Sequence, residues 1–175
     1  MTKQDEKIYI EASGHIWEEM GPREALTIAI YNEQAAYDFY SGLVGVIENE
    51  GGKIKFKFLA DDEKRHRQLL EERYQKEGGG EKFVFDPSKA KKIEVKVDDQ
   101  TGAIDAVELA LEGEKAASEF YKQAAQNTRD KEGRRMFERL AEDEEGHYEL
   151  LLAEREALLG GPFWFSEDEQ RLMED

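Results

Sequence analysis

The chain repeats itself with an offset of 81 residues, and this repeat limits the folds that it can adopt. Two pairs of segments match without a gap between them: residues 29–40 with 110–121, and residues 58–70 with 139–151. Three polar residues of the first half recur in the second: Glu33 as Glu114, Glu63 as Glu144, and His66 as His147. Two related units that pack about a pseudo-twofold axis bring such equivalent residues together at the centre of the molecule.

Each repeat unit has the pattern of two long helices. Proline suits the first helical position, so Gly21-Pro22 predicts a helix start, and the glycine clusters at 51–52, 78–80 and 160–161 predict helix ends. The expected helices cover residues 22–50, 53–77, 101–127 and 129–159. This pattern predicts an all-α, antiparallel four-helix bundle.

Residues 78–98, between helices 2 and 3 of this bundle, are too many for an ordinary helix-to-helix loop. Phe83–Phe85 and residues 93–97 have β-like patterns, and Asp86-Pro87 marks a turn between them. We therefore expect a long, partly extended crossover. The domain organisation expected around it is an N-terminal extension with a short helix (1–20), the bundle (21–160) and a tail with a short helix (161–175).

A carboxylate interrupts the apolar face of every predicted helix. In the first helix, Ile30, Glu33 and Tyr37 follow one another at three- and four-residue steps, which places them on one face. Glu63, Glu114 and Glu144 occupy the same kind of position in the other helices. On two helices a histidine follows three residues later and so points the same way: His66 and His147.

Four charged carboxylates in a shared core repel each other and lose their hydration. Either several of them stay protonated, or cations neutralise them; two divalent metal ions would balance all four. Iron or manganese suits carboxylate and imidazole ligands, and zinc would also bind. A duplication that merely preserves the pattern without a metal is the competing interpretation.

One Glu from each of two helices, with Glu-x-x-His from each of the other two, is the ligand set of di-iron carboxylate bundles. We expect Glu63, His66, Glu144 and His147 each to bind mainly one ion. Glu33 and Glu114 would be bridging or terminal ligands.

Four further residues are expected around these ligands. Metal-bound imidazoles usually donate their second N–H to a carboxylate, so the pseudo-symmetry predicts that Asp62 contacts His147 and that Asp143 contacts His66. Tyr40 and Tyr121 lie two turns beyond Glu33 and Glu114 on the same faces. They are expected to donate hydrogen bonds to ligand carboxylates or to fill the core.

The composition excludes several classes of function. There are 25 basic residues against 41 acidic ones, a formal net charge of -16, which argues against nucleic acid and anionic membranes as partners. The chain has no cysteine, and therefore no disulfide, thiolate metal site or cysteine nucleophile. With no apolar stretch long enough for a membrane span and no secretory signal, we expect a cytoplasmic protein.

Residues 22–159 resemble the rubrerythrin-like branch of the ferritin-like superfamily. The motifs that carry the resemblance are Glu33, Asp62-Glu63-Lys-Arg-His66, Glu114 and Asp143-Glu144-Glu-Gly-His147. The resemblance implies a ferritin-like bundle with two iron ions, often a homodimer. It also implies reduction of peroxide or dioxygen, or oxidation of ferrous iron.

The chain departs from the rubrerythrin pattern in two places. Rubrerythrins carry an additional Glu where this sequence has Ala117, whose repeat partner is Ala36, so the ligand set is of the six-residue, bacterioferritin-like type. Without cysteine there is no rubredoxin module, so electrons would come from a separate donor protein. The expected function is a non-heme di-iron oxidoreductase that reduces peroxide or dioxygen; the alternatives are a ferroxidase or iron-storage protein and a non-catalytic, metal-stabilised bundle.

Overall fold

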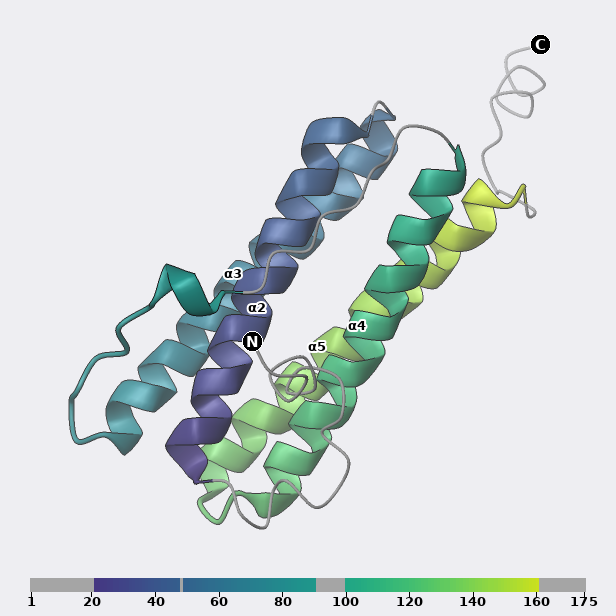
Figure 1. The fold of residues 1–175 in the computed structure, drawn as a ribbon. Helices are drawn as coiled ribbons and strands as arrows, with labels where there is room; N and C mark the ends of the chain where they lie inside the picture. Colours follow the sequence, from purple (N-terminus) through teal and green to yellow (C-terminus); the bar gives the residue numbers. More distant parts are fainter. Residues whose placement is uncertain (1–20, 48, 91–99, 161–175) are drawn as a thin grey trace, which may run out of the picture.

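Four long α-helices form the structure, a computed structural model that describes residues 21–47, 49–90 and 100–160 (Figure 1). The helices are α2 (Pro22–Val46), α3 (Glu50–Glu77), α4 (Gln100–Asn127) and α5 (Lys131–Leu158). The described residues contain no strand. The predicted all-α, four-helix bundle is therefore confirmed.

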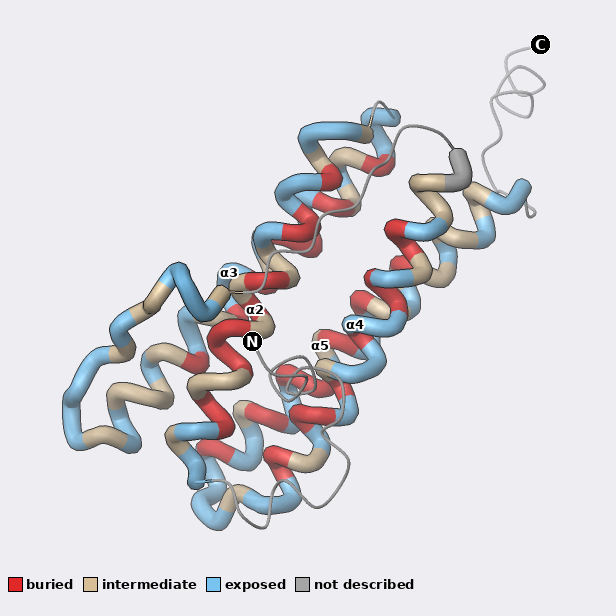
Figure 2. Tube along the Cα trace, viewed as in Figure 1, coloured by how far each residue is buried: buried red, intermediate tan, exposed pale blue. Residues whose placement is uncertain are grey.

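The bundle consists of the two predicted hairpins. Helix α2 packs along α3, and α4 packs along α5, while α3 and α5 provide most of the contact between the hairpins. The buried positions of each hairpin face the other one (Figure 2). This arrangement follows from the apolar stripe on each helix, which has to be covered by another helix.

Two separate apolar clusters make up the core. One, the Ile30 core, joins the start of α2 and α5 to the end of α3 and α4, and contains Leu26, Leu70 and Phe137. The other, the Leu59 core, lies toward the opposite end and contains Leu43, Val107 and Leu151. The four predicted Glu positions fall along each helix between these two clusters. The core thus shields a polar layer from both ends.

The predicted turn between the first two helices was wrong in its boundaries. Helix α2 ends at Val46 rather than at residue 50, and α3 begins at Glu50 rather than at residue 53. The physical reason is Asn49, whose side chain accepts a hydrogen bond of 2.9 Å from the backbone N–H of Gly52 and so caps α3. The glycine pair therefore lies inside the first turn of α3.

Helix α5 also begins later than predicted, at Lys131 rather than at residue 129. Asp130 is the N-cap, since its side chain accepts a hydrogen bond of 2.8 Å from the backbone N–H of Gly133. A salt bridge from Arg73 at the end of α3 holds the same carboxylate. One residue thus starts α5 and ties it to the other hairpin.

The first part of the crossover packs against the α2–α3 hairpin. Phe83 makes edge-on ring contacts with Tyr31 and Tyr74, at centroid distances of 5.8 and 5.2 Å. Tyr31 also accepts a hydrogen bond of 3.0 Å from the backbone N–H of Asp86. Phe83–Phe85 has no regular secondary structure, and a single turn of 3-10 helix, η2 (Pro87–Lys89), follows. The aromatic side chains here serve packing rather than strand pairing.

Other predictions fall outside the described residues. These are the short helices expected within 1–20 and 161–175, and the alternating segment at 93–97. None of the helices in the described part of the chain has the length and apolar character of a membrane span.

Two glycines of α5 should respond to alanine in opposite directions. Gly146 lies in the middle of the helix with open space around its Cβ position, so Gly146→Ala is expected to stabilise the protein by about 0.5–1 kcal/mol. Gly160 follows the helix with a φ of 75°, so Gly160→Ala should destabilise it by about 1–2 kcal/mol. Urea unfolding of both variants and the wild type measures the difference. Equal midpoints would contradict the helix end described above.

Candidate metal centre

Six polar side chains meet between the two apolar clusters. Each is at most 4 % exposed, although the set contains four carboxylates and two imidazoles: Glu33 from α2, Glu63 and His66 from α3, Glu114 from α4, and Glu144 and His147 from α5. Every helix thus contributes the residue expected from the repeat. Groups that prefer water so strongly are buried only where they are paired or bind a cation.

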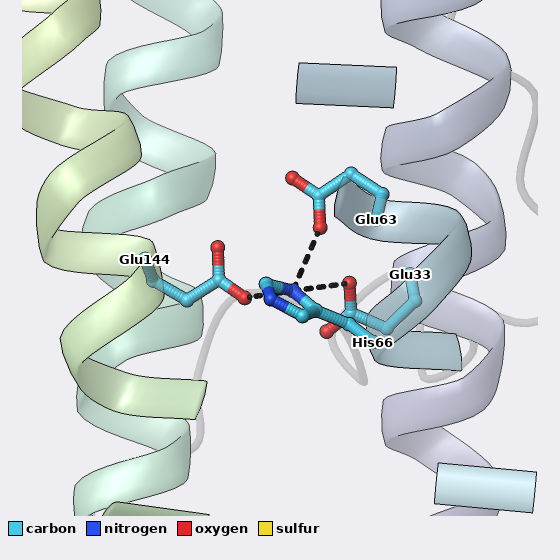
Figure 3. A group of neighbouring side chains, drawn as sticks. All are labelled: Glu33, Glu63, His66 and Glu144. Atoms are coloured by element: carbon cyan, nitrogen blue, oxygen red, sulfur yellow. Dashed lines mark ion pairs between the residues drawn. The ribbon is translucent and has the colours of Figure 1, made fainter. Parts of the chain in front are cut away.

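The six side chains form two overlapping groups. Glu33, Glu63, His66 and Glu144 offer ligand atoms that all lie within 4.8 Å of one another, and the same holds for Glu63, Glu114, Glu144 and His147. Glu63 and Glu144 belong to both groups. Figure 3 shows the first group, with His66 between the carboxylates of its own hairpin and Glu144 of the other.

This overlap refines the expected assignment of ligands. Glu33 and Glu114 each belong to one group only, so their geometry favours terminal positions over bridging ones. Glu63 and Glu144 lie where two ions could share them. That the two Glu-x-x-His carboxylates each bind mainly one ion stays a prediction, and the overlapping groups offer an alternative in which two ions share them.

Both histidines point the same nitrogen at the carboxylates. The Nδ1 atom of His66 lies 3.0 Å from Glu144 and 3.3 Å from Glu63. The Nδ1 atom of His147 lies 3.1 Å from Glu144 and 3.3 Å from Glu63. The rings stack with centroids 5.5 Å apart. The pseudo-twofold axis inferred from the repeat therefore runs between them.

The outer nitrogen of each histidine faces an aspartate of the opposite hairpin. The Nε2 atom of His147 lies 3.3 Å from Asp62, and that of His66 lies 3.3 Å from Asp143. This is the cross-pairing that the repeat predicts. A carboxylate in this place favours the tautomer with the proton on Nε2, which leaves the Nδ1 lone pair free for a metal.

Sequence reasoning missed the residue that joins the two aspartates. The guanidinium of Arg65 lies 3.2 Å from Asp62 and 3.8 Å from Asp143, so one cation spans both. Its repeat partner is Gly146, so the second hairpin carries no arginine at the equivalent position. The sequence could have pointed to Arg65, because it is a mismatch inside an otherwise matching motif.

Two tyrosines hold the terminal carboxylates. Tyr121 of α4 donates a hydrogen bond to Glu33 of α2, and Tyr40 of α2 donates one to Glu114 of α4. Burial, reinforced by those carboxylates, raises the pKa of both phenols well above the usual value of 10.0. Each tyrosine therefore stays a donor and fixes one oxygen of its partner.

Without a bound cation, the negative charge of the carboxylates is reduced by protons that the cluster itself retains. Burial, followed by the charge of Glu63, raises the pKa of Glu33 from 4.5 to about 8. The same two causes raise the pKa of Glu114 well above its usual value. The centre therefore favours positive charge, in the form of protons or of metal ions.

The histidines and Glu144 show the same demand for positive charge. Burial lowers the pKa of His66 and of His147, but their hydrogen bonds to the carboxylates outweigh it and raise both pKa values far above 6.5. Burial raises the pKa of Glu144, but its contacts with both histidines outweigh this effect and lower the pKa. Glu144 is thus more readily charged than Glu33 or Glu114.

The donor set fits a two-metal centre. Three of its atoms are buried and lie within 3.3 Å of another ligand atom of the set, but no described residue is placed to form a hydrogen bond with them: Glu63 Oε1, His66 Nδ1 and Glu144 Oε1. Buried polar atoms in folded proteins are nearly always paired, so these atoms point to a missing partner. Carboxylate oxygens and imidazole nitrogens are ligands for iron, manganese or zinc.

Comparison with known proteins supports the same interpretation. The sequence profile of the rubrerythrin family matches residues 24–155. A solved structure of a hypothetical protein from Pyrococcus furiosus is similar to this chain at 30% sequence identity and a TM-score of 0.74; the match covers 89% of this chain and 96% of that one. None of the curated proteins compared with the chain matches it.

The stability of the metal-free protein should fall as the pH rises from about 4.5 to about 8. The folded state holds a proton on Glu33 up to a pKa of about 8, whereas the unfolded chain releases it near 4.5, so the unfolded state binds fewer protons in this range. The raised pKa values of the two histidines act in the same direction above pH 6.5. Thermal unfolding in the presence of a chelator measures the effect. A constant or rising melting temperature between pH 5 and 8 would contradict it.

Removing an outer aspartate should weaken metal binding. Asp62→Ala is expected to lower the affinity by about 10–100-fold, because His147 loses the carboxylate that orients it. Asp61→Ala is the matched control, since Asp61 is exposed and pairs with Lys57 on the same helix. Competition with a chromophoric chelator gives both affinities. Equal affinities for the two variants would contradict the assigned role.

Proposed function

This chain belongs to the rubrerythrin family, and we propose that it is a non-heme di-iron oxidoreductase that reduces peroxide or dioxygen. The observation that carries the proposal is the pair of overlapping ligand groups that share Glu63 and Glu144. Two adjacent sites with shared carboxylates favour two ions that act together rather than one structural ion. Peroxide reduction needs two electrons, which two ferrous ions would supply when bound.

The residues of the chain would hold the ions and control their surroundings. Glu33, Glu63 and His66 with Glu144 would hold one ion, and Glu114 and His147 with the two shared carboxylates would hold the other. Four carboxylates balance two divalent ions, so the reduced centre would be neutral within a low-dielectric core.

The contacts around the ligands would keep this geometry during turnover. Asp62 and Asp143 orient the imidazoles, while Tyr40 and Tyr121 each hold one carboxylate oxygen. The Ile30 core and the Leu59 core keep water out from the two ends. Groups that are held before the reaction need little rearrangement when charge develops, which is how such sites lower reaction barriers.

Electrons and protons would come from outside the centre. The 175 residues contain no cysteine, so they hold no thiolate-ligated iron that could pass electrons. We therefore include a separate electron-donor protein in the proposal. Each peroxide consumes two electrons and two protons and yields two water molecules.

Anaerobic purification, metal counting and oxidant mixing test the proposal. We expect two iron ions per chain and a change in the ultraviolet–visible spectrum on addition of one equivalent of peroxide to the reduced protein. Glu144→Gln should lose iron and peroxide consumption together. The variant keeps the shape of the side chain and removes one of four mutually repelling carboxylates, so it is expected to fold.

Glu142→Ala is the control, because Glu142 is exposed on the same helix. It should keep both iron and activity. Two bound ions without a spectral change under either oxidant would contradict the redox function and favour a metal-stabilised bundle. Iron uptake far beyond two ions per chain, in a large assembly by light scattering, would favour storage instead.

A further inference from the structure

A groove between α2 and α4 opens directly onto the metal-binding carboxylates. The hairpins contact each other mainly along α3 and α5, and a cavity of about 210 Å³ lies between the other two helices. Its deep end is formed by Glu33, Tyr40, Glu63, Glu114 and Glu144. The route from the surface to the centre therefore runs between α2 and α4.

The walls of this groove are small and mostly apolar. On α2 they include Ala35, Ala36 and Phe39, and on α4 Ala110, Gly113 and Ala117, while Asn32 and Glu112 add polar groups. Short side chains facing each other from two helices leave space where larger ones would close it. No lysine, arginine or histidine lines the groove, so the described residues offer an anion no counter-charge there.

The opposite face of the centre is covered by larger side chains. Arg65 spans Asp62 and Asp143 at the α3–α5 seam. The ring of Phe58 lies edge-on to His147, with centroids 6.3 Å apart. Among the described residues, the opening is thus on the α2–α4 side.

Two carboxylates stand at the deep end. Glu63 and Glu144 line the groove, and their buried Oε1 atoms lie 3.3 and 3.0 Å from a histidine Nδ1 without forming a hydrogen bond to any described residue. They belong to residues that are at most 1 % exposed. A ligand or a metal ion reached through the groove would therefore meet the most polar atoms of the centre at the end of an apolar passage.

We propose that this groove binds an uncharged, largely apolar organic molecule about the size of one aromatic ring, with one end at the centre. The volume sets an upper limit on the size, since the 210 Å³ also includes the space among the ligand carboxylates and an enclosed apolar cavity of about 150 Å³ binds benzene. The lining decides the chemistry, because small-molecule sites are mainly apolar with a few polar groups that set orientation. Binding in the groove does not depend on the proposed function.

Ligand-observed nuclear magnetic resonance on the full chain tests binding, with benzyl alcohol as the probe and metal-free protein to exclude ligation to a metal. We expect saturation transfer to benzyl alcohol, and at least tenfold weaker binding of benzoate, which has the same ring but a negative charge. Absence of transfer to benzyl alcohol, or tighter binding of benzoate, would overturn the proposal.

Two groove-filling variants locate the site. Ala36→Leu and Ala117→Leu enter the groove from facing helices and should each weaken benzyl alcohol binding at least tenfold. Ala153→Leu is the matched control, since Ala153 is exposed on α5. Unchanged benzyl alcohol binding in both groove variants would overturn the proposed site. If one variant fails to fold, the other alone decides the test.

Metal content separates this proposal from the proposed function. The groove variants and the control should bind as much metal as the wild type, because no metal ligand is changed. A protein that binds benzyl alcohol in the groove but no metal would leave the groove in place and remove the di-iron function. A protein that binds two ions but no benzyl alcohol would remove the groove site alone.

Discussion

The mutual repulsion of four buried carboxylates is the constraint on which the rest of the structure depends. The four are at most 4 % exposed, and one apolar cluster lies on each side of them: Glu33, Glu63, Glu114 and Glu144. At low dielectric such a group of charges is stable only with positive charge among them. The histidines and the tyrosine hydroxyls stabilise the carboxylates through hydrogen bonds and ion pairs, and bound cations would neutralise their remaining charge. The chemistry proposed for the centre uses the same demand.

The repeat makes this concentration of charge possible. A single hairpin presents two carboxylates and one histidine on its apolar face, which is too polar to be buried alone. Pairing with its copy completes two ligand groups at once, and each aspartate supports the histidine of the other hairpin. Metal binding would therefore hold the hairpins together as well as provide chemistry.

The centre has two different faces, one between α3 and α5 and the other between α2 and α4. Arg65 has Gly146 as its partner, so one guanidinium rather than two spans the aspartates and covers the α3–α5 side. On the α2–α4 side, Ala36 and Ala117 are repeat partners and both small, which leaves the groove open. A covered side and an open side are what a centre needs if small molecules are to reach it by one route.

The sequence by itself determined the four helices, the repeat and the six polar residues at core positions, because helical periodicity and an offset of 81 residues are local, countable patterns. It also predicted the cross-pairing of Asp62 with His147, since that follows from the symmetry. Only the tertiary structure decided which carboxylates lie in both ligand groups, that Arg65 joins the two aspartates, and that a groove separates α2 from α4. Those features depend on distances between hairpins, and a linear pattern carries no such distances. The helix boundary near Gly51 was decided by the side-chain cap of Asn49, a competition between local hydrogen bonds that glycine content alone did not resolve.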